Sequence, residues 1–408
     1  MAANNTFAGS LNAMFKENYA DKIEDLIPDG VKVLNMIKFM PKDKQPGNLY
    51  HQPVILGLEH GVTFASSDED AFNLNAPIAG VIKDAQVRGY PMVLRSVLGY
   101  TAASRAAQGG KQAFMDATKY LVSNMLRSVT KKLEIEMLYG QLGYATVASN
   151  VGPLLTITTS EWAPGIWAGA EGMPVEIRSV SGAVSRGVFT VASVSMDNQT
   201  VTLNEDPTPL TAGDVIWHKG AYGNEFPGIH FILQNTGTIF NINAGVYNLF
   251  KGNNYPAGGA ALSFNKLNLA AARGVEKGQD GKLVAMVNPR AWSNMMNDQA
   301  ALRRYDGSYS KEKAEMGSKS ILFHSQNGEI EIQPSIYIKQ GYAFLLNVED
   351  WMRVGSQDVS FKRPGQGEEF FRDLENAAGY ELRLYTDQAV FCMAPGRSTF
   401  ISGIVNST

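Results

Sequence analysis

The spacing of apolar residues changes several times along this chain, and its clearest pattern is that of a long helix. From Gln108 to Tyr139 apolar residues recur at intervals of three and four, the period of one helix face, and Gly140 closes the pattern. The stripe comprises Val122, Leu126, Val129, Leu133 and Met137. At 1.5 Å per residue the helix would be on the order of 45 Å long, so we expect a spine along the molecule.

Charged residues lie between the apolar positions of this helix and favour an exposed flank. They are Lys119, Arg127, Lys131, Lys132, Glu134 and Glu136. The cations have two interpretations of equal weight. They form either a solvated face or a contact with a neighbour's carboxylates or with DNA phosphates.

Before the helix, the period of two predicts strands. Val54 to Leu56 and Gly61 to Ala65 lead to an acidic tip at Asp68, Glu69 and Asp70, and the chain returns through Ala79 to Tyr100. We expect a long two-stranded hairpin, which is at best marginally stable alone and must lie against something else. The tip lacks the regular oxygen spacing of a calcium loop, which favours a solvated turn over a cation site.

A block of short β-branched segments follows the helix. Strands are expected around Val175 to Ile177, Gly187 to Val191, Thr200 to Leu203 and Gly213 to Trp217. This block, with bounds 165–222, reads as an inserted small β-barrel or sandwich.

The remainder mixes both periods and predicts an α+β protein. We expect a strand at Gly228 to Leu233, a helix at Phe264 to Arg273, a strand at Lys282 to Val287 and a helix at Pro289 to Asn297. Later strands are expected at Gly341 to Val348, Gly379 to Thr386, Gln388 to Met393 and Phe400 to Val405. This late ladder suggests a platform domain that both halves of the chain complete.

Composition narrows the function. The 408 residues are 44% hydrophobic, with a formal charge of -3, so the chain lacks the basic balance of proteins that bind nucleic acid tightly. A container for DNA benefits from such neutrality, because adhesion would hinder packing and release. The one cysteine, Cys392, lies in an apolar run and reads as a buried hydrophobe. With neither a secretory signal nor a membrane span expected, we predict synthesis in the cytoplasm.

No arrangement of residues predicts catalysis. The five histidines have no metal-ligand spacing, and there is no P-loop, dinucleotide fingerprint or nucleophile elbow. A hydrolase would need a pocket that gathers residues such as His230, Asp214 and Glu225. We therefore predict no enzyme activity, no catalytic residues, no cofactor and no metal site.

The order of these elements resembles the Hong Kong 97-like coat proteins of tailed bacteriophages. The stretches that carry the resemblance are Val81 to Tyr90, the spine from Gln108, Tyr380 to Tyr385 and Gln388 to Phe391. The resemblance implies a fold with an N-arm, an extended E-loop hairpin, a P-domain with spine helix and β ladder, and an A-domain. The corresponding ranges are 1–48 for the arm, 49–105 for the E-loop, 106–146 for the spine, 223–345 for the A-domain with parts of the P-domain, and 346–408 for the ladder and C-terminus. The block at 165–222 would be an addition to the minimal fold.

The function that this resemblance implies is that of a major capsid protein. Copies would self-assemble into the pentamers and hexamers of an icosahedral head, in the virion, around double-stranded DNA that the inner face contacts non-specifically. The other partners that the resemblance implies are scaffolding, portal and decoration proteins, and no contact with a membrane is expected. The candidate inter-subunit contacts are Asp68, Glu69, Asp70, Arg88, Arg95, Arg127, Lys131 and Lys132.

Three alternatives stay open at this point. The same fold could form an encapsulin-like compartment around an enzyme cargo. The chain could instead be a hydrolase with a β-rich accessory domain. A tail or adhesin protein would explain the strand-rich insert, but the long spine helix disfavours it.

Overall fold

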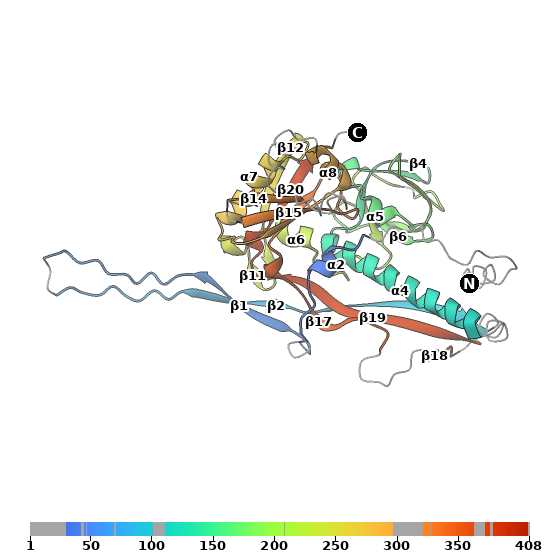
Figure 1. The fold of residues 1–408 in the computed structure, drawn as a ribbon, viewed down its shortest axis with the longest axis horizontal. Coiled ribbons are helices and arrows are strands. Elements are labelled where there is room, and N and C mark those ends of the chain that lie inside the picture. Colours follow the sequence, from blue (N-terminus) through green and yellow to red (C-terminus); the bar gives the residue numbers. More distant parts are fainter. Residues whose placement is uncertain are drawn as a thin grey trace, which may run out of the picture.

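The computed structural model describes residues 30–41, 45, 47–68, 71–100, 111–207, 209–296, 321–326, 328–362, 372–375 and 378–406. A globular body carries a hairpin that projects far from it, and a long helix lies along a sheet at the base of the body (Figure 1). Helices and strands are both present, so the α+β class is confirmed. The helices are α2 (Val33–Met36), α4 (Lys111–Tyr139), α5 (Pro164–Trp167), α6 (Ile229–Gln234), α7 (Phe264–Val275) and α8 (Pro289–Met296).

The hairpin is shorter than the expected range 49–105. Strand β1 (Tyr50–Gly57) pairs antiparallel with β2 (Val81–Val87), and β3 (Tyr90–Gly99) then leaves to join another sheet. At Gly89, between β2 and β3, a Cβ atom would lie 2.3 Å from the Asp387 carboxylate, so the chain passes tightly against its new partner. The prediction that the return strand runs to Tyr100 is therefore wrong, because period two identifies a strand but not its partner.

The base of the body is a sheet built from both ends of the chain. Strand β19 (Gly379–Cys392) pairs with β3 along one edge and with β17 (Trp351–Ser360) and β18 (Arg372–Asp373) along the other. Helix α4 lies along this sheet (Figure 1), and the two contribute Leu133 and Leu384 to one buried core. The expectation of a platform completed by both halves of the chain is confirmed.

A second sheet has six strands in the order β12-β20-β16-β13-β15-β14. Alternate residues of β13 face opposite sides: Leu283, Ala285 and Val287 pack with α7 and α8, whereas Val284 and Met286 join the core that contains α4. Its strands are β12 (Asn253–Ala260), β13 (Leu283–Val287), β14 (Ile321–Ser325), β15 (Gly328–Pro334), β16 (Ala343–Leu346) and β20 (Thr399–Ile404). The expected ladder strands near residues 343 and 400 thus belong to this sheet and not to the platform.

A closed barrel follows α4 in the sequence and precedes β12, with the strand order β4-β5-β8-β7-β6-β9. It begins at residue 145 rather than at the expected 165, because two short strands precede the tryptophan-containing loop. Its strands are β4 (Ala145–Val151), β5 (Leu154–Ile157), β6 (Pro174–Arg178), β7 (Ser185–Ser195), β8 (Thr200–Leu203) and β9 (Val215–His218). Pairing of Ala145 with Ile216 brings the two ends of the barrel together. A two-stranded element, β10 (Thr238–Ile239) and β11 (Ile242–Asn243), lies farther along the chain.

The segment from Gly228 to Leu233 is not the expected strand. Residues Ile229–Gln234 form α6 instead, a helix of fewer than two turns whose N-cap residue is Gly228. The six residues IHFILQ present β-branched and aromatic side chains, a composition that does not separate a short buried strand from a short buried helix. The predicted helices that begin at residues 264 and 289 and the strand that ends at Val287 are confirmed.

Candidate assembly surface

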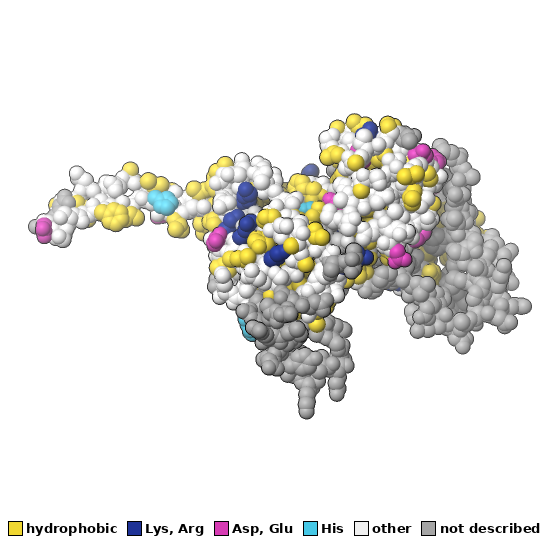
Figure 2. All heavy atoms as spheres, turned by 90° about the horizontal axis from the view of Figure 1, so that it is seen from above, with side chains coloured by type: hydrophobic (Ala, Val, Ile, Leu, Met, Phe, Trp, Pro, Cys, Tyr) yellow, Lys and Arg dark blue, Asp and Glu magenta, His cyan; other side chains and the backbone are white. Residues whose placement is uncertain are grey.

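The projecting hairpin exposes a series of large apolar side chains that the other described residues of the chain leave uncovered. Phe64 is 90% exposed, Leu74 80% and Leu58 74%. We call this series the hairpin surface, and its members are Ile55, Leu58, Val62, Phe64, Phe72, Leu74, Ile78 and Ile82. Apolar side chains follow the whole length of the projection in Figure 2. Contiguous exposed apolar surface of this kind marks a site of protein–protein contact.

The base of the hairpin is fixed firmly to the body. Ala85 and Val87 of β2 are buried, and the Tyr50 ring packs edge-on to Phe391 with centroids 6.0 Å apart. The Gln86 amide donates to the Phe240 carbonyl at 2.9 Å. The hairpin therefore starts in a defined direction before it leaves the body.

Beyond β1 and β2 the two sides of the hairpin are held by few bonds. The His60 amide donates to the Ile78 carbonyl at 3.1 Å, and Asn75 bonds to the Thr63 hydroxyl at 2.8 Å and to the Val62 carbonyl at 2.9 Å. A two-stranded ribbon of this sort is marginal in water unless it packs on another surface. The described bonds within this part of the hairpin are therefore few for a ribbon of its length.

The acidic tip is partly described. Asp68 is exposed and accepts a hydrogen bond of 3.4 Å from the Ser67 hydroxyl, whereas Glu69 and Asp70 lie outside the described residues. The carboxylate of Asp68 is therefore available to a partner at the far end of the hairpin.

The two candidate arginines near the hairpin base differ in what they contact. Arg88 is exposed beside a groove of about 360 Å³. Among the described residues, no hydrogen bond or ion pair engages its guanidinium. Arg95 pairs with Glu381 at 2.6 Å, and the carboxylate is only 5% exposed. Arg88 thus remains free to meet another subunit, whereas Arg95 already neutralises a buried charge of its own sheet.

Lys131 and Lys132 face the interior of the chain instead of an exposed flank. Lys131 donates to the Ala168 carbonyl, and Lys132 lies 3.2 Å from the Tyr144 hydroxyl and 3.1 Å from the Met173 sulfur. Burial lowers the pKa of Lys131 to about 8 and that of Lys132 to about 7. The two lysines fasten α4 to the barrel. Arg127, one turn earlier, is half-buried.

Glu134 and Glu136 also leave the expected exposed flank. Glu134 is fully buried and accepts the amide protons of Lys32, Val33 and Leu34 at 3.0, 2.9 and 2.8 Å. It thereby satisfies the orphan amides at the start of α2. Burial raises its pKa, and the three amide bonds oppose that rise. No local feature of the sequence marks this contact, because the three amides lie about a hundred residues earlier in the chain.

The described part of the expected N-terminal arm packs on its own chain. Val33, Leu34, Ile37 and Met40 are buried. Arg353 donates from Nε to the Ile37 carbonyl at 2.8 Å and forms a parallel bridge with Phe39. Residues 30–40 are therefore packed against their own chain. Residues 1–29 of the expected arm lie outside the described residues.

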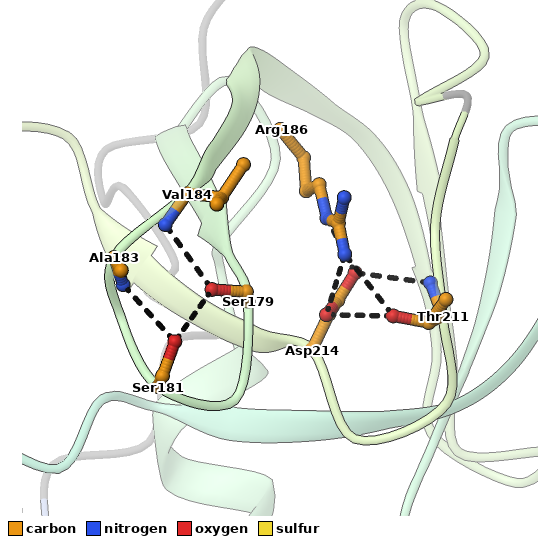
Figure 3. A network of polar contacts seen from close by, with 7 residues as sticks. All are labelled: Ser179, Ser181, Ala183, Val184, Arg186, Thr211 and Asp214. Carbon is orange, nitrogen blue, oxygen red and sulfur yellow. Dashed lines mark hydrogen bonds and ion pairs between the residues drawn. The ribbon is translucent and has the colours of Figure 1, made fainter.

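A polar network closes one end of the barrel (Figure 3). Asp214, with its side chain 1% exposed, accepts from Arg186 Nε at 2.9 Å and from the Thr211 amide at 3.0 Å. Burial would raise the pKa of Asp214, but these donors outweigh it and lower the pKa. In the neighbouring turn the Ser179 hydroxyl accepts the Val184 amide at 3.1 Å. These bonds satisfy the turn and have the character of structural support.

The residues of the hydrolase alternative do not share one environment. Asp214 is engaged in the barrel, whereas Glu225 accepts the Gln141 amide at 3.2 Å beside the end of α4. His230 is buried among aromatic rings, 4.3 Å from the centroid of Phe400. Burial lowers the pKa of His230 to about 3, so the ring is held neutral.

Two further features of the described residues concern metal binding and membrane spans. Within that part of the chain, no group of three or more histidine, cysteine or acidic side chains is placed to hold a metal ion. No helix there has the length and apolar character needed to cross a membrane.

Comparisons with known proteins rest on structure. No family model matches the sequence, and no curated protein matches it. The capsid asymmetric unit of cyanophage A-1(L) has a TM-score of 0.57 at 10% identity, with 96% of this chain and 98% of that chain covered. The capsid of a native GTA particle has a TM-score of 0.51 at 8% identity, with 99% and 100% covered.

The holo-SrpI encapsulin complex from Synechococcus elongatus PCC 7942 also covers 100% of this chain, at a TM-score of 0.41 and 8% identity. The two stronger matches cover almost the whole length of both chains. The chain therefore has the fold of a phage capsid protein.

Proposed function

We propose that this chain is the major capsid protein of a tailed bacteriophage, with the Hong Kong 97-like arrangement of parts. In this proposal β1, β2 and the loop between them form the E-loop. Helix α4 and the sheet of β3, β17, β18 and β19 form the P-domain, the six-stranded sheet forms the A-domain, and the barrel at 145–218 is the inserted domain. Similarity of fold over nearly the whole chain supports this assignment.

The observation that carries the proposal is the hairpin surface. Fully burying a large apolar side chain contributes about 1.5–3 kcal/mol, so eight such side chains on one projection form a strong docking element. The partner is a second copy of the chain, whose body receives the hairpin and orders it. Repeated around a shell, this contact joins subunits into pentamers and hexamers.

The remaining partners follow from that role. A closed head encloses double-stranded DNA, and a scaffolding protein, a portal and decoration proteins act on the same shell. The protein is then a component of the virion, made in the host bacterial cytoplasm, and has no enzyme activity of its own. These partners are part of the proposal and rest on the capsid role.

Negative-stain electron microscopy with sedimentation of the recombinant protein, with and without a candidate scaffold, tests the proposal. Closed shells, tubes or rings of five or six subunits are expected. A monodisperse monomer under every condition would overturn it. The contents of native particles provide the second readout: genomic DNA supports a phage head, whereas an enzyme cargo supports an encapsulin-like compartment.

A further inference from the structure

A polar groove on the body gathers three cations from two separate segments. Its volume is about 480 Å³, and its polar lining includes Gln234, Asn248, Lys251, Asn254, Arg273 and Lys277. Lys251 and Asn254 lie beside and within β12, whereas Arg273 and Lys277 come from the end of α7 and the turn after it. Lys and Arg side chains gather on the side of the body nearest the hairpin in Figure 2, where α7 lies in Figure 1.

The groove holds two of the cations in place. Arg273 donates to the Asn254 carbonyl and stands over the Tyr255 ring, 5.2 Å from its centroid. Lys277 donates to the Lys251 carbonyl at 2.8 Å. The stem of Lys277 also passes Gly396, where an added Cβ would lie 3.0 Å from its Cδ. The guanidinium of Arg273 and the ammonium of Lys277 are thus positioned at the groove by contacts to neutral groups of the chain.

The charges are not balanced within the groove. Among the described residues that line it there is no carboxylate, and no hydrogen bond or ion pair occupies the Lys251 ammonium in that part of the chain. Burial lowers the pKa of Lys277, and the Lys251 charge lowers it further, although the neighbouring Glu276 partly compensates. Cations near the end of a helix have a structural explanation in the helix dipole, but Lys251 belongs to another segment and adds a third charge.

We infer that this basic groove binds a phosphate group. A lysine ammonium binds phosphate as a point charge, and an arginine guanidinium binds it through two parallel N–H donors. The three side chains therefore suit a small anion with several acceptor oxygens. Exposed amides of Gln234 and Asn248 supply further donors. The phosphate belongs either to a nucleic acid backbone or to a free phosphate or nucleotide, and the inference stands whether or not the chain forms shells.

Binding by the full-length protein tests this inference. The probes are inorganic phosphate, measured by calorimetry, and a fluorescent 12-nucleotide DNA, measured by anisotropy at several salt concentrations. Lys251→Gln should weaken binding at least tenfold. The matched control, Lys266→Gln, removes the same charge from α7, where the ammonium bonds the Ala261 carbonyl at 2.7 Å, and should change affinity less than twofold.

The outcomes separate the two sources. Saturable DNA binding that requires Lys251, with a salt slope that falls by ~0.7–0.9 in the variant, supports a backbone phosphate. Binding of inorganic phosphate alone supports a free phosphate. Equal losses in the two variants, no binding of either probe, or displacement only by an acidic peptide would overturn the inference. Matched thermal unfolding of wild-type and variant protein establishes that Lys251→Gln is folded.

Discussion

The hairpin and the barrel are both β-structures that extend from the same platform, but they treat their apolar residues in opposite ways. In the barrel every strand has a partner on each side, and residues such as Ile177 and Val191 point inward and are buried. The hairpin has only two strands, with a backbone hydrogen bond from the base of β2 to the body at Phe240, and Phe64 and Leu74 lie in solvent. The barrel buries its apolar residues in a core of its own, whereas the hairpin leaves its apolar residues exposed.

This difference in burial means that the barrel residues and the hairpin residues should affect different properties: the stability of one subunit and the assembly of several. Apolar side chains inside the barrel contribute to the free energy of folding of one subunit. Those of the hairpin contribute little until another surface covers them, so under the proposed function their effect is expected in the association of subunits. Mutations in the two elements should therefore be seen by different measurements.

The largest expected effect is on assembly. The double variant Phe64→Ser, Leu74→Ser should leave the free energy of unfolding of the isolated subunit within ~0.5 kcal/mol, because both side chains are already exposed. Shells or rings should be lost, as judged by sedimentation velocity and electron microscopy.

A control for this prediction comes from the barrel. Val151 is 79% exposed, so Val151→Ser removes apolar surface of a similar kind at a different place. Normal assembly of the hairpin variant, or equal loss in both variants, would contradict the special role of the hairpin surface.

The next effect is on the barrel itself. Asp214→Ala leaves Arg186, whose side chain is 19% exposed, without its counter-ion. Removal of one member of a buried pair costs about 3–5 kcal/mol. Urea unfolding followed by tryptophan fluorescence measures the loss, and Asp197→Ala, in the exposed turn between β7 and β8, serves as the control. Equal stability of the two variants would show that the network in Figure 3 is dispensable.

The smallest effect concerns the junction of α4 with the barrel and depends on pH. Burial, with the Glu225 charge, raises the pKa of Glu136 from 4.5 to about 8. Between these values the folded protein holds a proton that the unfolded chain releases, so stability falls as pH rises toward 8. Glu136→Gln removes this loss, and its amide oxygen can still accept the Phe226 amide, which lies 3.0 Å from the carboxylate.

The variant should match wild type near pH 5 and exceed it by ~1 kcal/mol or more above pH 8, since one pKa unit corresponds to ~1.4 kcal/mol. Urea unfolding at a series of pH values measures the difference. Glu205→Gln, at an exposed loop of the barrel, should show no such trend. A gap between Glu136→Gln and wild type that is constant with pH would rule out the titration of Glu136 as its cause.

Local pattern was enough to predict elements whose residues contact their own neighbours in sequence. The stripe of α4 and the amphipathic α7 identify helices, since their periods extend over several turns. Helix α6 was missed because six residues, four of them apolar, are too few to reveal a period. Strand β4 was missed because the small and polar residues Ala148, Ser149 and Asn150 interrupt its alternation, and β5 because it has only four residues directly after Gly152 and Pro153.

Long-range partners were beyond the reach of pattern. Nothing local to Lys131 and Lys132 indicates that Ala168 and Met173 of the barrel region cover them. Glu134 likewise contacts amides about a hundred residues earlier in the chain. Of the hairpin surface, the sequence predicted the strands, through their alternation of apolar and polar residues. It did not predict which side chains are exposed, because that depends on where the chain departs from the hairpin and β3 joins β19.

The pairing of β3 with β19 has a consequence for the time course of synthesis. Tyr90 pairs with Gln388, so β3 leaves the ribosome long before its partner exists. At ~5–20 residues per second the interval is roughly 15–60 s. During that time a ten-residue strand, Tyr90–Gly99, has an open edge and can pair with another nascent chain. Yield of this protein should therefore respond to chaperones and to the rate of translation more than to the stability of the finished subunit.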